Sequence, residues 1–154
     1  ILVDRFSNVV SPQKDGSVNE RLGFYKIAVE DILSNPVLGI GIGNWKLKSI
    51  PRANQFLEGY RVPYRTHNDF LEIAAEIGIV GAICFIYFIF YPFIISLNTI
   101  ISKKELGLSF ILFLSIGVYI FDSLFNFPMH RPVNFMYLIF VFTLFNKAKV
   151  KKLL

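Results

Sequence analysis

The chain has 154 residues and a formal net charge of +5, and 54% of its residues are hydrophobic while only 18% are charged. An average soluble domain is about 45–50% apolar and about 25% charged, so this composition argues against an ordinary soluble protein and for a membrane-embedded one. The single cysteine, Cys84, excludes an internal disulfide, and no spacing of Cys and His residues indicates a zinc site.

The first predicted element is a helix over residues 20–34. Ser17 and Glu20 have the spacing of a capping box, and Pro36 ends the helix because the residue before a proline is pushed out of the helical region. Arg21 opposes the helix dipole in the first turn, and its position alone favours indifference over a use. We expect the helix to lie on the membrane surface. Its apolar stripe, facing lipid or the helix bundle, would consist of Leu22, Tyr25, Val29, Ile32 and Leu33.

A glycine-rich segment follows, with the sequence Gly-Ile-Gly-Ile-Gly-Asn-Trp at residues 39–45. It looks superficially like a dinucleotide-binding loop, but that fingerprint has Gly-x-Gly-x-x-Gly between a strand and a helix, and here a helix precedes it. We therefore predict a close backbone turn against the membrane surface, with Trp45 as an interfacial anchor.

Residues 46–65 are predicted to be irregular and basic. Only Glu58 offsets the five cations Lys46, Lys48, Arg52, Arg61 and Arg65. One interpretation is a solvated basic loop, which the pattern alone favours. The other is an anion site, in which guanidinium groups hold a phosphate through paired hydrogen bonds.

A helix start is expected at Thr66, with the Asp69 carboxylate in its first turn. His67 would lie just above the membrane at this helix N-terminus, which disfavours an imidazolium. A neutral imidazole can accept a proton, as a general base must. A lone histidine at such a place is more often a capping or surface residue, and the spacing alone favours that interpretation.

Three apolar segments follow, at about residues 73–97, 106–125 and 132–145. A membrane-spanning helix needs about 20 apolar residues, so the first is long enough and the second nearly so. The third is short and is expected to tilt or to thin the bilayer. Asp122, near the outer end of the second segment, is either a functional acid or, as we favour, part of a pair with Arg131 or His130.

The positive charge is concentrated beside these segments. Lys103 and Lys104 separate the first two, and four lysines follow the third: Lys147, Lys149, Lys151 and Lys152. Short loops rich in Lys and Arg stay in the cytoplasm, so we place both clusters inside and residues 1–72 outside. This position explains the basic tail without nucleic acid. The predicted fold is an all-α fragment of a polytopic membrane protein. It has a large periplasmic loop with a short amphipathic helix at 1–72, and two to three transmembrane helices within 73–154.

Three segments, taken together, resemble the C-terminal region of the O-antigen ligase and O-antigen polymerase superfamily. They are RLGFYKIAVEDILSNPVLGIGIGNW at 21–45, HNDFLEIAAEIGIVG at 67–81 and FNFPMHRP at 125–132. Members of that family are multi-pass enzymes of the bacterial inner membrane. They move a glycan from an undecaprenyl-diphosphate carrier to a hydroxyl of a growing glycan, of lipid A–core or of a protein.

The resemblance implies that His67 is the catalytic base and that Arg21 contacts the carrier diphosphate. Asn68, beside the histidine, would be a substrate contact. One arginine poorly offsets a diphosphate, so we expect substrate binding by further arginines as well, namely Arg52, Arg61 and Arg65. The family uses another arginine from an earlier loop, and we expect this chain to be a piece of a longer protein with more helices upstream.

A glycosyl diphosphate already has a good leaving group, so cations that hold the developing charge and a base for the acceptor hydroxyl would suffice. We therefore expect neither a metal nor another cofactor. The alternative function is a transporter or a non-catalytic protein on the same scaffold. A transporter should have polar or broken helices at the bilayer midplane, where the first span offers only Cys84 and Tyr87. That favours the enzyme.

Overall fold

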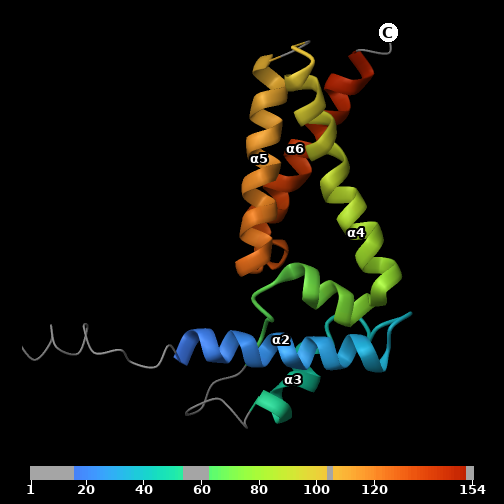
Figure 1. Ribbon diagram of the computed structural model, residues 1–154, viewed down its shortest axis with the longest axis vertical. Helices are drawn as coiled ribbons and strands as arrows, with labels where there is room; N and C mark the ends of the chain where they lie inside the picture. Colours follow the sequence, from blue (N-terminus) through green and yellow to red (C-terminus); the bar gives the residue numbers. More distant parts are fainter. Residues whose placement is uncertain (1–15, 54–62, 104–105, 152–154) are drawn as a thin grey trace, which may run out of the picture.

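The computed structural model describes residues 16–53, 63–103 and 106–151. The secondary structure within these ranges is helical, as the sequence predicts for an all-α membrane fragment. The elements are α2 (Gly16–Ser34), α3 (Trp45–Ala53), α4 (Asp69–Ile101), α5 (Leu106–Phe125), the 3₁₀ helix η1 (Pro128–His130) and α6 (Pro132–Lys151). Helices α4, α5 and α6 form an upright bundle, and α2 lies across its lower end with α3 below it (Figure 1).

Helices α4 and α5 are each long and apolar enough to cross a membrane. Only 33% and 28% of their most apolar windows are buried inside the protein, whereas the core helix of a soluble protein is mostly buried. Their outward side chains are therefore suited to lipid or to further helices. The inward ones form one core with α6, made of Ile89, Leu112, Ile116, Tyr119, Leu138, Val141 and Phe145.

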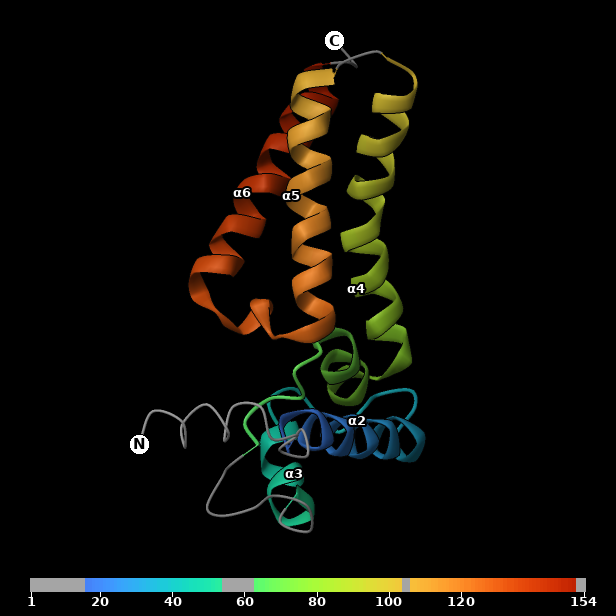
Figure 2. The ribbon, with the colours of Figure 1, turned by 60° about the vertical axis from the view of Figure 1, so that its left-hand side comes forward.

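The turn after α4 and the C-terminal end of α6 lie at the same end of the bundle (Figures 1 and 2). The turn with η1 lies at the opposite end, beside α2. This arrangement follows from three successive antiparallel helices, and it places Lys103 at the end where α6 finishes. The assignment of that end to the cytoplasm stays a prediction.

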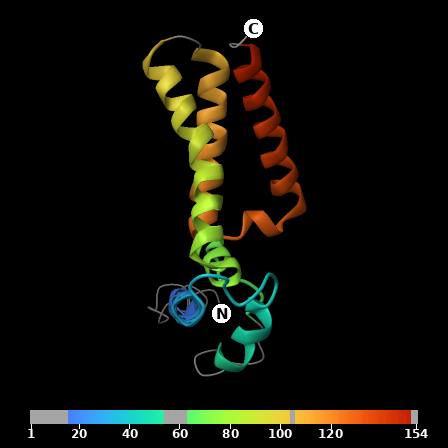
Figure 3. The ribbon, with the colours of Figure 1, turned by 90° about the vertical axis from the view of Figure 1, so that its right-hand side faces the viewer.

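Helix α2 packs on the rest of the protein mainly through side chains outside the predicted stripe. Its buried side chains are Phe24, Ile27, Ala28 and Asp31, which lie three or four residues apart and face α3 and the start of α4. Of the predicted stripe, Leu22, Val29 and Leu33 are exposed, whereas Ile32 is partly buried against the same cluster. That the exposed ones face lipid stays a prediction. The buried face was hard to recognise because it includes a small residue and a carboxylate. Figure 3, which views α2 along its axis, shows α3 and the start of α4 on one side of it.

Helix α3 replaces the irregular structure predicted for the first part of residues 46–65. Its buried positions are Trp45, Ser49 and Ala53, which recur every four residues. Only one of the three is large and apolar, so hydrophobic periodicity did not reveal the helix.

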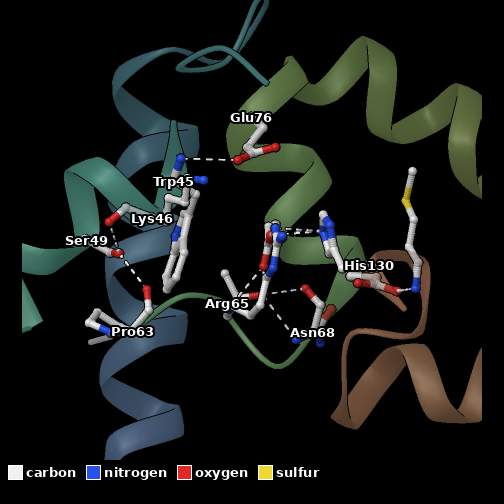
Figure 4. Close-up of polar contacts among 12 residues, drawn as sticks. Trp45, Lys46, Ser49, Pro63, Arg65, Asn68, Glu76 and His130 are labelled. Atoms are coloured by element: carbon white, nitrogen blue, oxygen red, sulfur yellow. Dashed lines mark hydrogen bonds and ion pairs between the residues drawn. The ribbon is translucent and has the colours of Figure 1, made fainter. Parts of the chain in front are cut away.

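Trp45 is fully buried, so the prediction of an interfacial anchor was wrong. The edge of the Phe24 ring packs against its indole, with ring centroids 6.1 Å apart. Its backbone N–H donates to the Glu76 carboxylate at 3.1 Å (Figure 4). Trp45 thus joins α2, α3 and α4 rather than contacting the membrane surface.

The predicted glycine turn does form, and it docks against a break in α4. Gly78 interrupts the helix with φ 76° and ψ 177°, and the segment before it runs alongside α2 while the segment after it rises through the bundle (Figure 1). Three backbone hydrogen bonds of 2.8 Å close this junction: Ile40 N to Ala75 O, Gly41 N to Glu76 O and Ile79 N to Pro36 O. We call these contacts the backbone clasp.

Gly78→Ala is expected to lower the melting temperature of the full-length protein in detergent. A β-carbon at Gly78 would lie 2.1 Å from the Val37 carbonyl oxygen, and the backbone conformation itself costs a side chain about 1–3 kcal/mol. Gly43→Ala isolates the effect of positive φ, because Gly43 also has φ 76° but nothing lies within 4 Å of its added β-carbon. A loss no larger for Gly78→Ala than for Gly43→Ala would contradict the importance of the clasp.

Candidate active site

His67 lies in a short loop two residues before the first residue of α4. Its backbone is left-handed, with φ 60°, which is uncommon for a residue other than glycine and costs about 1–3 kcal/mol. Asn68 caps the helix by accepting a hydrogen bond from Leu71 N at 3.0 Å. The helix therefore starts later than the prediction from Thr66. Thr66 Oγ1 instead accepts a hydrogen bond from Asn68 N at 3.1 Å and shapes the loop.

The His67 ring is held between two phenylalanines from distant parts of the chain. Phe24 of α2 stacks on it, with centroids 6.3 Å apart and planes at 13°. Phe127, just before η1, approaches edge-to-face with centroids 5.1 Å apart. The Tyr25 hydroxyl donates to the His67 carbonyl oxygen at 3.2 Å. Helix α2 and the η1 turn together fix the imidazole.

Burial and neighbouring charges lower the pKa of His67 below its ordinary value of 6.5. Desolvation is the largest cause, followed by the positive charge of Arg21, and Arg131 acts in the same direction. Glu72 and Glu20 act in the opposite direction. The imidazole is therefore neutral at pH 7 and can accept a proton. Its buried Nδ1 has no hydrogen-bond partner among the described residues.

Arg21 and His67 are 46 positions apart in the sequence, yet the fold brings the two side chains within electrostatic reach. Arg21 lies one helical turn before Phe24 and Tyr25, the two residues of α2 that contact His67. Within the described ranges, Arg21 forms no ion pair with a carboxylate, so its charge is available to a ligand.

Arg65 differs from Arg21 because its charge is paired with the buried carboxylate of Glu72. The Glu72 side chain is 1% exposed and accepts from Arg65 Nη1 at 2.8 Å and from Thr66 N at 2.9 Å. His130 Nε2 lies 3.0 Å from the same carboxylate and 3.2 Å from Arg65 Nη1 (Figure 4). Glu72 thereby ties the His67 loop to the η1 turn.

Two further hydrogen bonds connect the same segments. The Asp69 carboxylate accepts from Met129 N at 2.9 Å, and the Asn68 side-chain amide donates to the Leu124 carbonyl at 3.2 Å. Both polar ends of the Asn68 side chain thus have partners within the protein. The η1 turn is held by contacts that the sequence did not indicate.

The structure places Arg52 away from His67. Its guanidinium donates to Asp31 at 2.7 Å and to the Lys48 carbonyl at 2.9 Å. Asp31 lies about 10 Å further along α2 than Phe24, at 1.5 Å per residue. The remaining predicted arginine, Arg61, lies outside the described residues.

The predicted pairing of Asp122 with Arg131 or His130 is not formed. Asp122 accepts a hydrogen bond from the Asn126 side chain at 2.7 Å, while His130 contacts Glu72. Arg131 instead lies over the Phe127 ring, with its guanidinium carbon 4.8 Å from the centroid. Sequence reasoning did not assign Arg131 or Phe127 to the site, although both belong to the segment FNFPMHRP.

No group of His, Cys, Asp and Glu residues able to hold a metal ion is found in the described part of the chain.

Comparison with known proteins assigns the chain to a family. Residues 1–86 match the model of a protein family described as O-antigen ligase. The matched segment is more than half of the chain and includes Arg21, the glycine turn, His67 and the break in α4. Neither the curated proteins nor the solved structures contain a match to the chain.

Proposed function

Because the chain belongs to the O-antigen ligase family, we propose that it is part of a membrane glycosyltransferase that uses a lipid-linked donor. The donor is a glycan on an undecaprenyl-diphosphate carrier, and the acceptor is a hydroxyl of a growing glycan, of lipid A–core or of a protein. One observation carries this proposal: a neutral imidazole, His67, is fixed close to a cation, Arg21, that has no carboxylate partner among the described residues.

The reaction needs one proton transfer and one displacement. The acceptor oxygen forms a bond to the anomeric carbon of the glycan while His67 takes the hydroxyl proton. The bond from that carbon to the diphosphate oxygen breaks, and the carrier diphosphate leaves with the electron pair. Arg21 offsets the charge that develops on the leaving group. Guanidinium groups make this possible without a metal, so we propose a metal-independent reaction.

In this proposal, Arg52 and Arg65 have structural roles. Arg52 is paired with the buried carboxylate of Asp31 and Arg65 with that of Glu72, and each pair neutralises much of the charge that would bind a diphosphate. Arg65 helps to position the His67 loop. Asn68 fixes the start of α4 beside the base. A substrate contact by any of these residues stays a prediction.

The site suits a donor anchored in the bilayer. It lies at the end of the bundle where the start of α4 meets α2, beside the η1 turn and next to the apolar spanning parts of α4 and α5 (Figure 2). We place this end on the outer face of the bacterial inner membrane, with residues 1–72 in the periplasm. The break in α4 at Gly78 is near this end rather than at the middle of the bundle, so it does not favour a transporter.

Transfer by the full-length protein tests the proposal. Purified protein in lipid nanodiscs, given a glycan on undecaprenyl diphosphate and a candidate acceptor, should release undecaprenyl diphosphate and elongate the acceptor in equal amounts. EDTA should not reduce the rate. Absence of transfer with growing-glycan, lipid A–core and peptide acceptors alike would contradict the enzymatic function.

A further inference from the structure

Arg131 is an exposed cation at the same site, outside the residues that match the family model. It follows η1 and precedes α6, and it is 64 positions from His67 in the sequence. Of the four arginines described by the structure, Arg52 and Arg65 are paired with buried carboxylates. Arg21 and Arg131 form no such pair within the described ranges. Among the arginines of the described ranges, these two therefore have charge available to an anion.

The distance from Arg131 to the base is bounded by the aromatic contacts. The guanidinium carbon is 4.8 Å from the Phe127 centroid, and that centroid is 5.1 Å from the centre of the His67 ring. The two distances share one point, so Arg131 lies no more than about 10 Å from the imidazole. This is roughly the span of a sugar diphosphate that contacts groups at each end.

Among the described residues, the Arg131 side chain contacts the Phe127 ring and forms no hydrogen bond or ion pair. A cation over an aromatic ring is attracted by the ring quadrupole and not by a hydrogen-bond acceptor. The contact with Phe127 therefore leaves the guanidinium donors available to a ligand. The backbone of Arg131 has separate partners, because its N–H donates to Pro128 and its carbonyl accepts from Phe135.

The segment that carries Arg131 is fixed relative to His67. Three contacts connect η1 and the end of α5 to the loop and first turn of α4: His130 with Glu72, Met129 N with Asp69, and the Asn68 amide with Leu124 O. The first two involve buried carboxylates, so they cost free energy to break. The fold itself thus holds the backbone that carries Arg131 close to the His67 loop.

We propose that Arg131 is a further diphosphate-binding cation, which holds the isoprenoid diphosphate of the donor together with Arg21. The inference rests on the proposed function for the identity of the ligand. Two guanidinium groups reach His67 from different elements, α2 and the η1 turn, and each can offer paired hydrogen bonds to a phosphate. A diphosphate between them would sit beside the base, with its glycan directed toward the imidazole.

Direct binding tests this proposal. The full-length protein would be reconstituted in phosphatidylcholine nanodiscs and titrated with radiolabelled undecaprenyl diphosphate. Arg131→Gln should weaken binding by about tenfold or more, as expected for the loss of charge-assisted hydrogen bonds, and Arg21→Gln should do the same. Arg131→Lys should also bind more weakly, because an ammonium cannot replace the guanidinium fork. Lys48→Gln, which removes an exposed cation of α3, is the matched control and should bind normally.

Two further measurements are needed. One distinguishes binding of a lipid headgroup from binding of the carrier diphosphate, and the other distinguishes failure of this inference from failure of the proposed function. If Arg131→Gln reduces retention of phosphatidylglycerol in mixed nanodiscs but leaves undecaprenyl diphosphate affinity unchanged, Arg131 anchors lipid headgroups and the inference is wrong. Wild-type transfer together with normal diphosphate binding by Arg131→Gln would overturn the inference and leave the proposed function standing. Diphosphate binding that depends on Arg131, without transfer to any acceptor, would support the inference and count against the proposed function. Equal melting temperatures would show that each variant is folded.

Discussion

His67→Asn should reduce transfer by the full-length protein by about 10²–10⁴-fold while leaving membrane insertion and melting temperature close to normal. Asparagine tolerates the left-handed backbone that His67 adopts, and its amide has no basic nitrogen to accept the acceptor proton. The loss should therefore appear in the rate with saturating donor. Steady-state transfer with purified lipid-linked donor measures it.

His67→Gly is the companion variant, since glycine adopts the same backbone conformation without strain but removes the ring between Phe24 and Phe127. It should be as inactive as His67→Asn even if its stability differs. Near-normal transfer by either variant would exclude His67 as the base.

The pH dependence of the same reaction has a defined sign. The pKa of His67 is lowered below 6.5, so the neutral, active imidazole dominates at pH 7 and is lost as the pH falls through that lowered value. Burial and the charges of Arg21 and Arg131 lower it, against Glu72 and Glu20. Arg21→Gln removes one of these positive charges. The acid limb of its residual activity should therefore move to higher pH.

Glu72→Ala should have the largest effect on stability, a loss of up to about 3–5 kcal/mol, because it leaves the partly buried Arg65 and His130 without their carboxylate partner. Arg65, His130 and the Thr66 N–H all converge on this carboxylate, which is almost completely buried. The variant should melt at a markedly lower temperature in detergent and should lose transfer, since the His67 loop and the η1 turn would no longer be tied together.

Glu30→Ala is the matched control for the loss of an acidic side chain. Glu30 is half-exposed and lies 3.9 Å from Arg52, an arrangement worth at most about 1 kcal/mol. If Glu72→Ala were as stable as Glu30→Ala, the carboxylate would not be what holds the loop. Comparison of the two melting curves under identical conditions decides this.

The sequence predicted the helical class and the presence of the glycine turn, because both depend on local signals: long apolar runs, capping residues and closely spaced glycines. It did not predict α3, whose buried face contains Ser49 and Ala53, or the packing face of α2, which includes Asp31. In both helices, small or polar residues occupy buried positions. Periodicity counts only large apolar residues and so misses them.

The candidate site was accessible from sequence only in part. His67 and Arg21 were singled out through the resemblance to a family, since their chemistry alone favoured ordinary roles. Which arginines would be paired depends on tertiary contacts: Arg52 meets Asp31 across two helices, and Arg65 meets Glu72 one helical turn into α4. Arg131 approaches His67 only because α5 returns the chain to the level of α2.

The backbone clasp also fixes the position along α4 at which its membrane-spanning part begins. From Ile79 to Ile101, α4 rises about 34 Å at 1.5 Å per residue, close to the roughly 30 Å of a hydrocarbon core. The clasp lies at the start of this length, and His67 lies a short way before it in the chain, in the loop that precedes α4. If α4 spans the bilayer as proposed, tilt of the bundle would accommodate a thicker or thinner one. In the proposed enzyme, main-chain geometry would then set the height of the imidazole above the lipid, where a donor is held at the headgroup level.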